Sequence, residues 1–234
     1  MIKEAIQYVN GLVKPNVEEI NGFKYSDKSL HRINEPVISE EFKIKTLSGV
    51  VDYVNQNPDD LKDIRIVIED FNKVKVYSGL TNEKSRPLVL RSIAESVDLS
   101  RNVNTKMDAE LFNAFIQTHF IQDKSTQDIF SITGNLETES GLKTEDDGIS
   151  QNVVVKTSVI SKEKISIKNP IMLRPYRTFP EIEQPQSAYV LRIYQGNNAE
   201  LKTTENHIWI NEAVKSIKVY LKENIKEENV IIIA

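Results

Sequence analysis

Cationic and aromatic side chains are concentrated in one stretch of this sequence, between Val153 and Pro180. Its charged residues are six cations and a single anion, Glu163. Positive charges bind phosphates and aromatic rings stack on bases, so this combination is typical of single-stranded nucleic-acid binding. The residues that would form such a surface are Lys162, Lys164, Lys168, Arg174, Tyr176 and Arg177.

Two other interpretations fit the same residues. In the first, Lys162, Lys164 and Lys168 keep an edge strand from pairing with other chains, and aromatic residues such as Phe179 belong to the core. In the second, the basic strand faces the acidic segment 137–150 of a neighbouring copy, so that the charge asymmetry drives assembly. The sequence leaves all three interpretations open.

The same region contains half of the prolines in the chain, spaced five residues apart at Pro170, Pro175, Pro180 and Pro185. Proline lacks a backbone donor and fixes φ, so this spacing discourages regular sheet pairing and keeps the chain extended and stiff. Such a segment suits lying along a surface, either as an intramolecular strap over its own core or against a partner. In the second case, with arginine–carboxylate pairs between subunits, the interface residues are Arg174, Tyr176, Arg177, Phe179, Glu181 and Glu183.

Residues suited to catalysis or to cofactor binding are sparse. The chain has no cysteine, which excludes disulfides, iron–sulfur clusters, thiolate zinc sites and a cysteine nucleophile. The three histidines lack a second ligand at helical spacing, and no phosphate-binding loop or nucleophile elbow occurs. Glu181 and Glu183 could share acid–base work, but in an extended chain they are equally well solvated or ion-paired. We therefore expect no enzyme activity, no metal and no cofactor.

Length and composition are those of a globular protein. The 234 residues are 39% hydrophobic and 27% charged, and the net charge of −4 is too small to attract a polyanion to the whole molecule. This length suits a single domain over 1–234, or an N-terminal α/β part over 1–100 with a C-terminal α+β part over 101–234. No signal peptide or membrane span is recognisable, which indicates action in the cytoplasm without a membrane partner.

Helical spacing of apolar residues predicts up to five helices. The third expected stripe runs from Met107 to Ile116 and includes Leu111 on its inner face. In chain order we expect a helix over about 2–11, one capped by Thr46 and closed by Asn57-Pro58, the Met107 to Ile116 helix, one capped by Ser125 with Asp128, and one capped by Asn211.

Alternation of apolar and polar residues predicts the strands. They are expected at 64–68 and 73–77 as a hairpin, at 87–94, at 153–159 and 164–168, and in a hairpin turning at 196–198, with a further small hairpin around Asn21-Gly22. The apolar run from Val230 to Ala234 must be buried or paired with another chain. Strands and helices follow one another in irregular blocks, which predicts an α+β fold with mixed, mainly antiparallel sheets and four to five helices.

Several segments resemble a known family. The stretches "AIQYVNGLV", "YSDKSLHRI", "TLSGVVDYV", "DDGISQNVVVKTSV", "LRPYRTFPEIEQPQSAYVLRI" and "AVKSIKVYL" are similar to the YfdQ-like proteins of phages and prophages. The similarity extends over nearly the whole chain, and "PYRTFPE" is its most specific part. The resemblance implies a phage-encoded protein made in the bacterial host. It supplies no catalytic residue, cofactor or activity.

These observations predict a non-enzymatic accessory protein of phage or prophage origin. We expect it to act as a homo-oligomer or by binding a host or phage protein. The alternative is a single-stranded nucleic-acid-binding accessory of phage replication or recombination.

Overall fold

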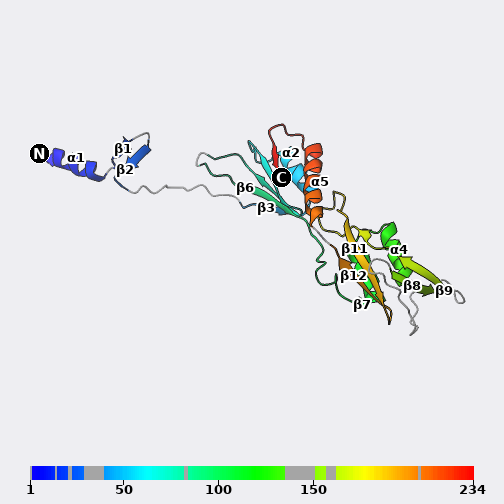
Figure 1. The fold of residues 1–234 in the computed structure, drawn as a ribbon. Coiled ribbons are helices and arrows are strands. Elements are labelled where there is room, and N and C mark those ends of the chain that lie inside the picture. Colours follow the sequence, from blue (N-terminus) through cyan, green and yellow to red (C-terminus); the bar gives the residue numbers. More distant parts are fainter. Residues whose placement is uncertain are drawn as a thin grey trace. The chain divides into compact units, whose positions relative to one another are not determined.

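The computed structural model describes residues 2–13, 15–20, 23–28, 40–81, 84–134, 151–156, 162–204 and 207–234, with the backbone alone at 10, 12–13, 23, 151–156 and 162–166. The chain divides into two compact units, Met1–Ser39 and Glu40–Ala234, which are considered separately. The described residues form five helices and thirteen strands (Figure 1). Seven of their nine strand pairs are antiparallel. The predicted α+β class with mainly antiparallel sheets is therefore confirmed.

The N-terminal unit consists of one helix and one hairpin. Helix α1 spans Ile2–Val13, and strands β1 (Val17–Ile20) and β2 (Phe23–Ser26) pair antiparallel. The backbone N–H of Asn16 donates to Asp27 Oδ1 over 2.7 Å and closes the base of the hairpin. The predicted helix and hairpin are both present, although the proposed turn residues Asn21 and Gly22 lie outside the described part of the chain.

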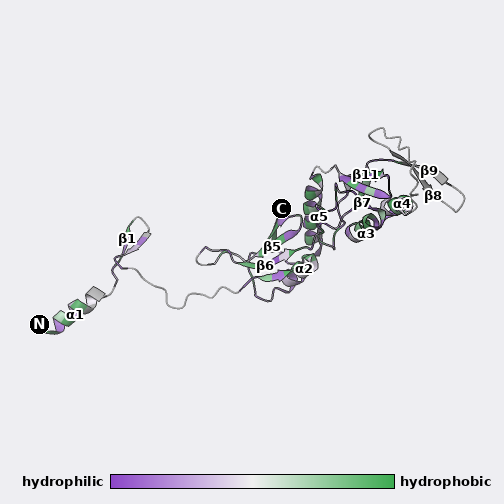
Figure 2. Ribbon diagram, turned by 90° about the horizontal axis from the view of Figure 1, so that it is seen from below, coloured by the Kyte–Doolittle hydropathy of each residue, from purple (hydrophilic) through white to green (hydrophobic). Residues whose placement is uncertain are grey.

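Large apolar side chains of this unit are uncovered. Helix α1 alternates hydrophobic and hydrophilic residues along its length (Figure 2). The described large apolar side chains of the unit are between 52% and 80% exposed, and they are Ile2, Ile6, Tyr8, Val9, Val17, Ile20 and Tyr25. None of the buried core residues comes from this unit. Within this unit, therefore, the helix and the hairpin do not cover their apolar surface.

A five-stranded sheet organises one part of the second unit. Its strands are β3 (Phe42–Ile44), β4 (Arg65–Asp70), β5 (Lys73–Tyr77), β6 (Leu88–Ile93) and β13 (Ile231–Ile233), in the order β13-β4-β5-β6-β3. The two edge strands run parallel to their neighbours, and the inner pairs are antiparallel. The predicted hairpin of β4 and β5 buries Ile66, Ile68, Val74 and Val76 on one face, as the alternation requires.

Two helices supply the apolar residues that cover that face. Helix α2 (Leu47–Gln56) begins at Thr46, whose side chain accepts a hydrogen bond from the backbone of Gly49, and it buries Leu47, Val50 and Val54. Helix α5 (Ile208–Asn224) buries Ile217 and Leu221 in the same cluster. We call this cluster the five-stranded core. In Figure 1 both helices lie beside the sheet.

A second core lies under an antiparallel sheet of four strands. These are β7 (Met107–Asp108), β10 (Ile171–Leu173), β11 (Ser187–Tyr194) and β12 (Asn198–Thr203), in the order β10-β11-β12-β7. Helices α3 (Ala109–His119) and α4 (Lys124–Thr133) pack here and contribute Phe112, Ile116 and Ile129. We call this cluster the four-stranded core. The predicted hairpin turn at 196–198 is present, with Gly196 at a φ of 78°.

Strands β8 (Gln151–Lys156) and β9 (Lys162–Ile167) form a separate antiparallel pair, in which Lys162 is the Cα partner of Lys156. The expected strand at 153–159 is present as far as Lys156, and residues 157–159 lie outside the described residues. The predicted C-terminal strand pairs in parallel with β4 of the same chain. Its Ile231 and Ile233 nevertheless stay 51% and 47% exposed, because they lie on the sheet face opposite Ile232, which packs against the core.

Three local expectations were wrong. Helix α4 is capped by Asp123, which accepts hydrogen bonds from the backbones of Ser125 and Thr126, so Ser125 lies inside the helix. Helix α5 begins at Ile208, after His207, so Asn211 is not its cap. In α3, Leu111 is 62% exposed, and Met107 belongs to strand β7. Local patterns located these helices but misplaced the first residues of α4 and α5 and part of the inner face of α3.

The contrast between two neighbouring positions of α5 tests the five-stranded core. Ile217 is fully buried and Val219 is 53% exposed. We expect Ile217→Ala to lower the free energy of unfolding by about 3 kcal/mol, because it removes buried methyl groups and leaves a cavity. Val219→Ala should change it by less than about 0.5 kcal/mol. Urea unfolding measures both values, and equal losses would show that α5 does not pack as described.

Candidate functional site

The proline-spaced segment 169–187 forms a strap within its own chain. Strand β10 pairs with β11, and the next residues pair with the connection between α3 and α4. There the N–H of Ile121 donates to Arg174 O over 2.8 Å, and the N–H of Tyr176 donates to His119 O over 3.0 Å. Farther on, Phe179 is fully buried in the five-stranded core. The strap thus leaves one core, enters the other and returns through β11.

Arg177 lies inside the fold at the centre of the strap, with 4% of its surface exposed. Its guanidinium donates to Ser187 Oγ over 3.1 Å and to the hydroxyl of Tyr189. It also stacks on Trp209, with Cζ 4.4 Å from the ring centroid. Trp209 in turn meets Phe71 edge to face, with 4.8 Å between ring centroids. The arginine therefore connects the sheet of one core with a helix and a turn of the other.

The backbone around Arg177 is held by the side chain of Gln184. Its Oε1 accepts from the N–H groups of Arg177 and Thr178, at 2.8 and 3.1 Å. Its Nε2 donates to Phe179 O over 3.0 Å. One buried amide therefore satisfies three backbone groups that the prolines keep out of regular sheet pairing.

The remaining charged residues of the strap pair within the chain. Arg174 forms a salt bridge with Glu183 over 3.2 Å, and Glu183 is largely exposed. Glu181 accepts from the backbone N–H of Ser48 over 2.9 Å and from its hydroxyl over 3.1 Å, at the N-terminus of α2. A carboxylate there is favoured by the unpaired N–H groups and by the helix dipole. Burial raises the pKa of nearby Tyr220, and the negative charge of Glu181 adds to that increase.

The structure separates the residues that the sequence grouped as one interface. Arg177 and Phe179 are buried, so they cannot contribute to an exposed binding surface. Arg174, Glu181 and Glu183 are engaged with partners of the same chain. Tyr176 is 39% exposed, and Lys168 is exposed as well. The side chains of Lys162 and Lys164 lie outside the described part of the chain.

The two carboxylates considered for acid–base work do not act as a pair. Glu181 is fixed to α2 and Glu183 to Arg174. Among the described residues, no group of three or more histidine, aspartate or glutamate side chains is arranged to hold a metal ion. His119 directs its ring nitrogen Nδ1 to Phe115 O and Thr118 Oγ1, which is a packing role.

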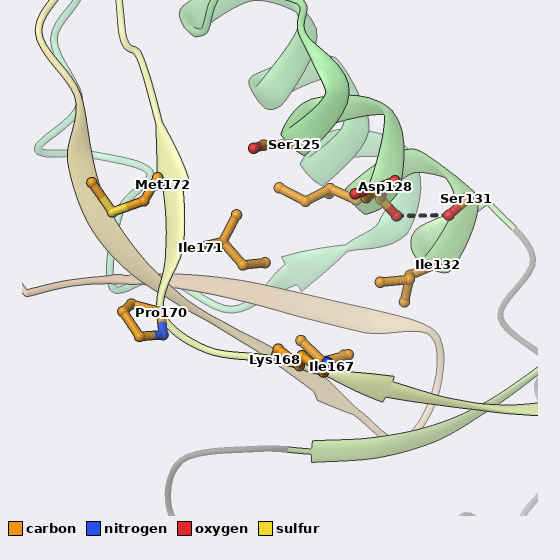
Figure 3. Close-up of a pocket in the computed structure, with 10 residues that line it drawn as sticks. Ser125, Asp128, Ser131, Ile132, Ile167, Lys168, Pro170, Ile171 and Met172 are labelled. Carbon is orange, nitrogen blue, oxygen red and sulfur yellow. Dashed lines mark hydrogen bonds between the residues drawn. The ribbon is translucent and has the colours of Figure 1, made fainter.

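A groove on the larger unit was not expected from the sequence. A groove of about 480 Å³ lies between α4 and the segment from β9 to β10 (Figure 3). Its apolar lining includes Ile129, Ile132 and Ile171, while Asp128 and Lys168 also line it. The sequence pattern predicted a helix here. It could not show that the adjoining strand would be an edge, which is what leaves the groove open.

Comparison with known proteins gives no relative: no family, no curated protein and no solved structure matches this chain. No described helix is both long and apolar enough to cross a membrane.

The two arginines of the strap provide a matched test of its internal role. We expect Arg177→Met to lower the free energy of unfolding by about 3 kcal/mol, because it removes charged hydrogen bonds and a desolvated stacking contact. Arg174→Met should cost less than about 1 kcal/mol, because its salt bridge is partly exposed. Urea unfolding of both variants measures the difference. A stable Arg177 variant would contradict the central position assigned to this side chain.

Proposed function

We propose that this protein is a non-enzymatic accessory protein of phage or prophage origin that acts by self-association through its N-terminal unit. The observation that carries the proposal is the uncovered apolar surface of α1 and the hairpin, where the described large apolar side chains are at least 52% exposed. The resemblance to YfdQ-like proteins supports the phage origin. Glu181 accepts a hydrogen bond from Ser48, and Glu183 is paired with Arg174, so the two carboxylates have different partners. This arrangement fits a role other than catalysis.

The elements of this unit are too small to be stable alone. Helix α1 has 12 residues, and isolated helices of that length are marginal in water. A two-stranded hairpin is marginal for the same reason, because it has no second layer to bury its apolar face. Burial of apolar surface stabilises by about 25 cal/mol per Å². Both elements would therefore gain stability from a surface that covers them.

The pattern of α1 favours a second copy as that surface. Ile2, Ala5 and Val9 recur at the alternating three- and four-residue spacing of a helix–helix seam, and Ile6 lies beside them. The charged residues Lys3 and Glu4 lie on other faces of the helix. Two identical helices can therefore face each other without like-charge repulsion. Because Lys3 and Glu4 cancel, the polar face also lacks the positive charge that attracts helices to anionic lipid.

Nucleic-acid binding remains the second candidate for Lys162, Lys164 and Lys168. The exposed side chain of Lys168 supports this candidate, because it is free to approach a phosphate. With Arg177 buried and Arg174 paired with Glu183, this surface would be smaller than the sequence predicted.

A charge placed on the apolar stripe should dissociate the assembly. We expect the full chain to have a native mass that is a multiple of 26.7 kDa, and Ile6→Glu to reduce it to that of one chain, because a carboxylate cannot be buried in an apolar contact without large cost. Gln7→Glu adds the same charge on the polar side of α1 and should leave the mass unchanged. Light scattering on a sizing column measures all three proteins.

The outcomes separate the candidate functions. A wild-type monomer, or an Ile6→Glu protein that keeps its mass, would contradict self-association through α1. A monomer whose peak carries nucleic-acid absorbance at 260 nm would favour the lysine surface instead. Affinity for labelled single-stranded DNA would then fall steeply with salt and fall again on neutralising the three lysines.

A further inference from the structure

Strand β10 leaves an open edge beside the groove at α4. It is the outermost strand of its sheet and pairs with β11 only, with Met172 as the Cα partner of Ala188. The backbone N–H of Thr204, just beyond β12, donates to the C=O of Ala188 over 3.4 Å. The N–H and C=O of Ala188 therefore point toward β12 and away from β10. Antiparallel pairing alternates strictly, so the N–H and C=O of Met172 are directed to the open edge. The Met172 side chain is 42% exposed.

The chain itself already uses the next part of this edge. Residues 119–121 lie along Arg174 to Tyr176 as a short extended segment, with one bridge between Phe120 and Pro175 and hydrogen bonds on both sides of it. This pairing stops before Met172. The edge is thus shaped to accept an extended backbone, and the part next to the groove has no such partner among the described residues.

The groove beside Met172 has a floor and two charged walls (Figure 3). Ile129, Ile132 and Ile167 form its apolar base and are at most 7% exposed. Asp128 projects from α4 and Lys168 from the end of β9, and neither is ion-paired with another described residue. Its volume of about 480 Å³ lies in the range of ligand sites.

We propose that this groove binds an extended peptide segment of another protein, which adds a strand to β10 at Met172. Backbone hydrogen bonds to Met172 would supply affinity, and one aliphatic side chain of the peptide would fill the space over Ile129 and Ile132. The opposite charges on the two walls select flanking residues of opposite sign, an acidic one facing Lys168 and a basic one facing Asp128. A groove that combines a strand edge, an apolar floor and flanking charges suits a peptide better than a compact small molecule.

This inference rests on residues of the larger unit, whereas self-association through α1 rests on residues of the N-terminal unit. The test uses the full chain, immobilised and presented with a displayed library of random octapeptides. Enriched peptides are synthesised with a fluorescein label, and their affinities are measured by fluorescence polarisation. We expect enrichment of sequences with one aliphatic residue between an acidic and a basic residue.

Three variants decide whether the selected peptides occupy the groove. Ser125→Arg fills it from α4 and should weaken binding at least tenfold, whereas Gln127→Arg, on an exposed position of the same helix, should stay within twofold of wild type. Met172→Pro removes the outward N–H without touching the pairing to β11 and should weaken binding at least fivefold. Thermal unfolding of each variant shows whether it is folded. If either the Ser125 or the Met172 variant fails to fold, the other still tests the groove.

Several results would overturn the proposal. One is a library that gives no enrichment over uncoated support. Another is a set of selected peptides that bind the Ser125→Arg protein within twofold of wild type. Affinity that disappears in the Ile6→Glu protein would assign the peptide site to the N-terminal unit. Affinity that persists there, in a protein whose mass has fallen to one chain, would separate groove binding from self-association.

Discussion

The stacking of Arg177 on Trp209, together with its hydrogen bonds to Ser187 and Tyr189, is the contact on which the larger unit depends. Tyr189 belongs to the four-stranded core, whereas Trp209 begins the helix that closes the five-stranded core. A guanidinium suits this position because it combines a flat face for stacking with several donors in its plane. An aliphatic side chain could fill the volume but could not satisfy the hydroxyl groups around it.

The strap explains how two sheets can share one compact unit. Its prolines prevent a continuous ladder, so its backbone groups are satisfied one at a time, by residues 119–121, by the N–H of Val97 on Tyr176 O, and by Gln184. The contacts with residues 119–121 and with Val97 join segments that are distant in sequence, and so does the hydroxyl of Thr178, which donates to Phe71 O. The least regular segment of the sequence therefore links several distant parts of the chain.

Periodic elements were the part of this fold that the sequence could predict. The β4–β5 hairpin, the Thr46 cap of α2 and the inward face of α5 follow from the spacing of apolar residues and from one hydroxyl. Burial of Arg177 could not be predicted, because arginine is usually exposed and its stacking partner lies 32 residues away. The groove was missed for a related reason, since strand order decides which strand is an edge.

The pairing of β13 with β4 has a consequence for synthesis of the chain. Ile66 has Ile232 as its partner, so more than 160 residues separate the two strands. At about 5–20 residues per second, a ribosome needs roughly 10 to 30 s to make the intervening chain. During this interval β4 has been synthesised but one of its edges lacks its partner. The five-stranded sheet is therefore completed late, and the nascent chain presents an apolar strand edge to chaperones and to other nascent chains until then.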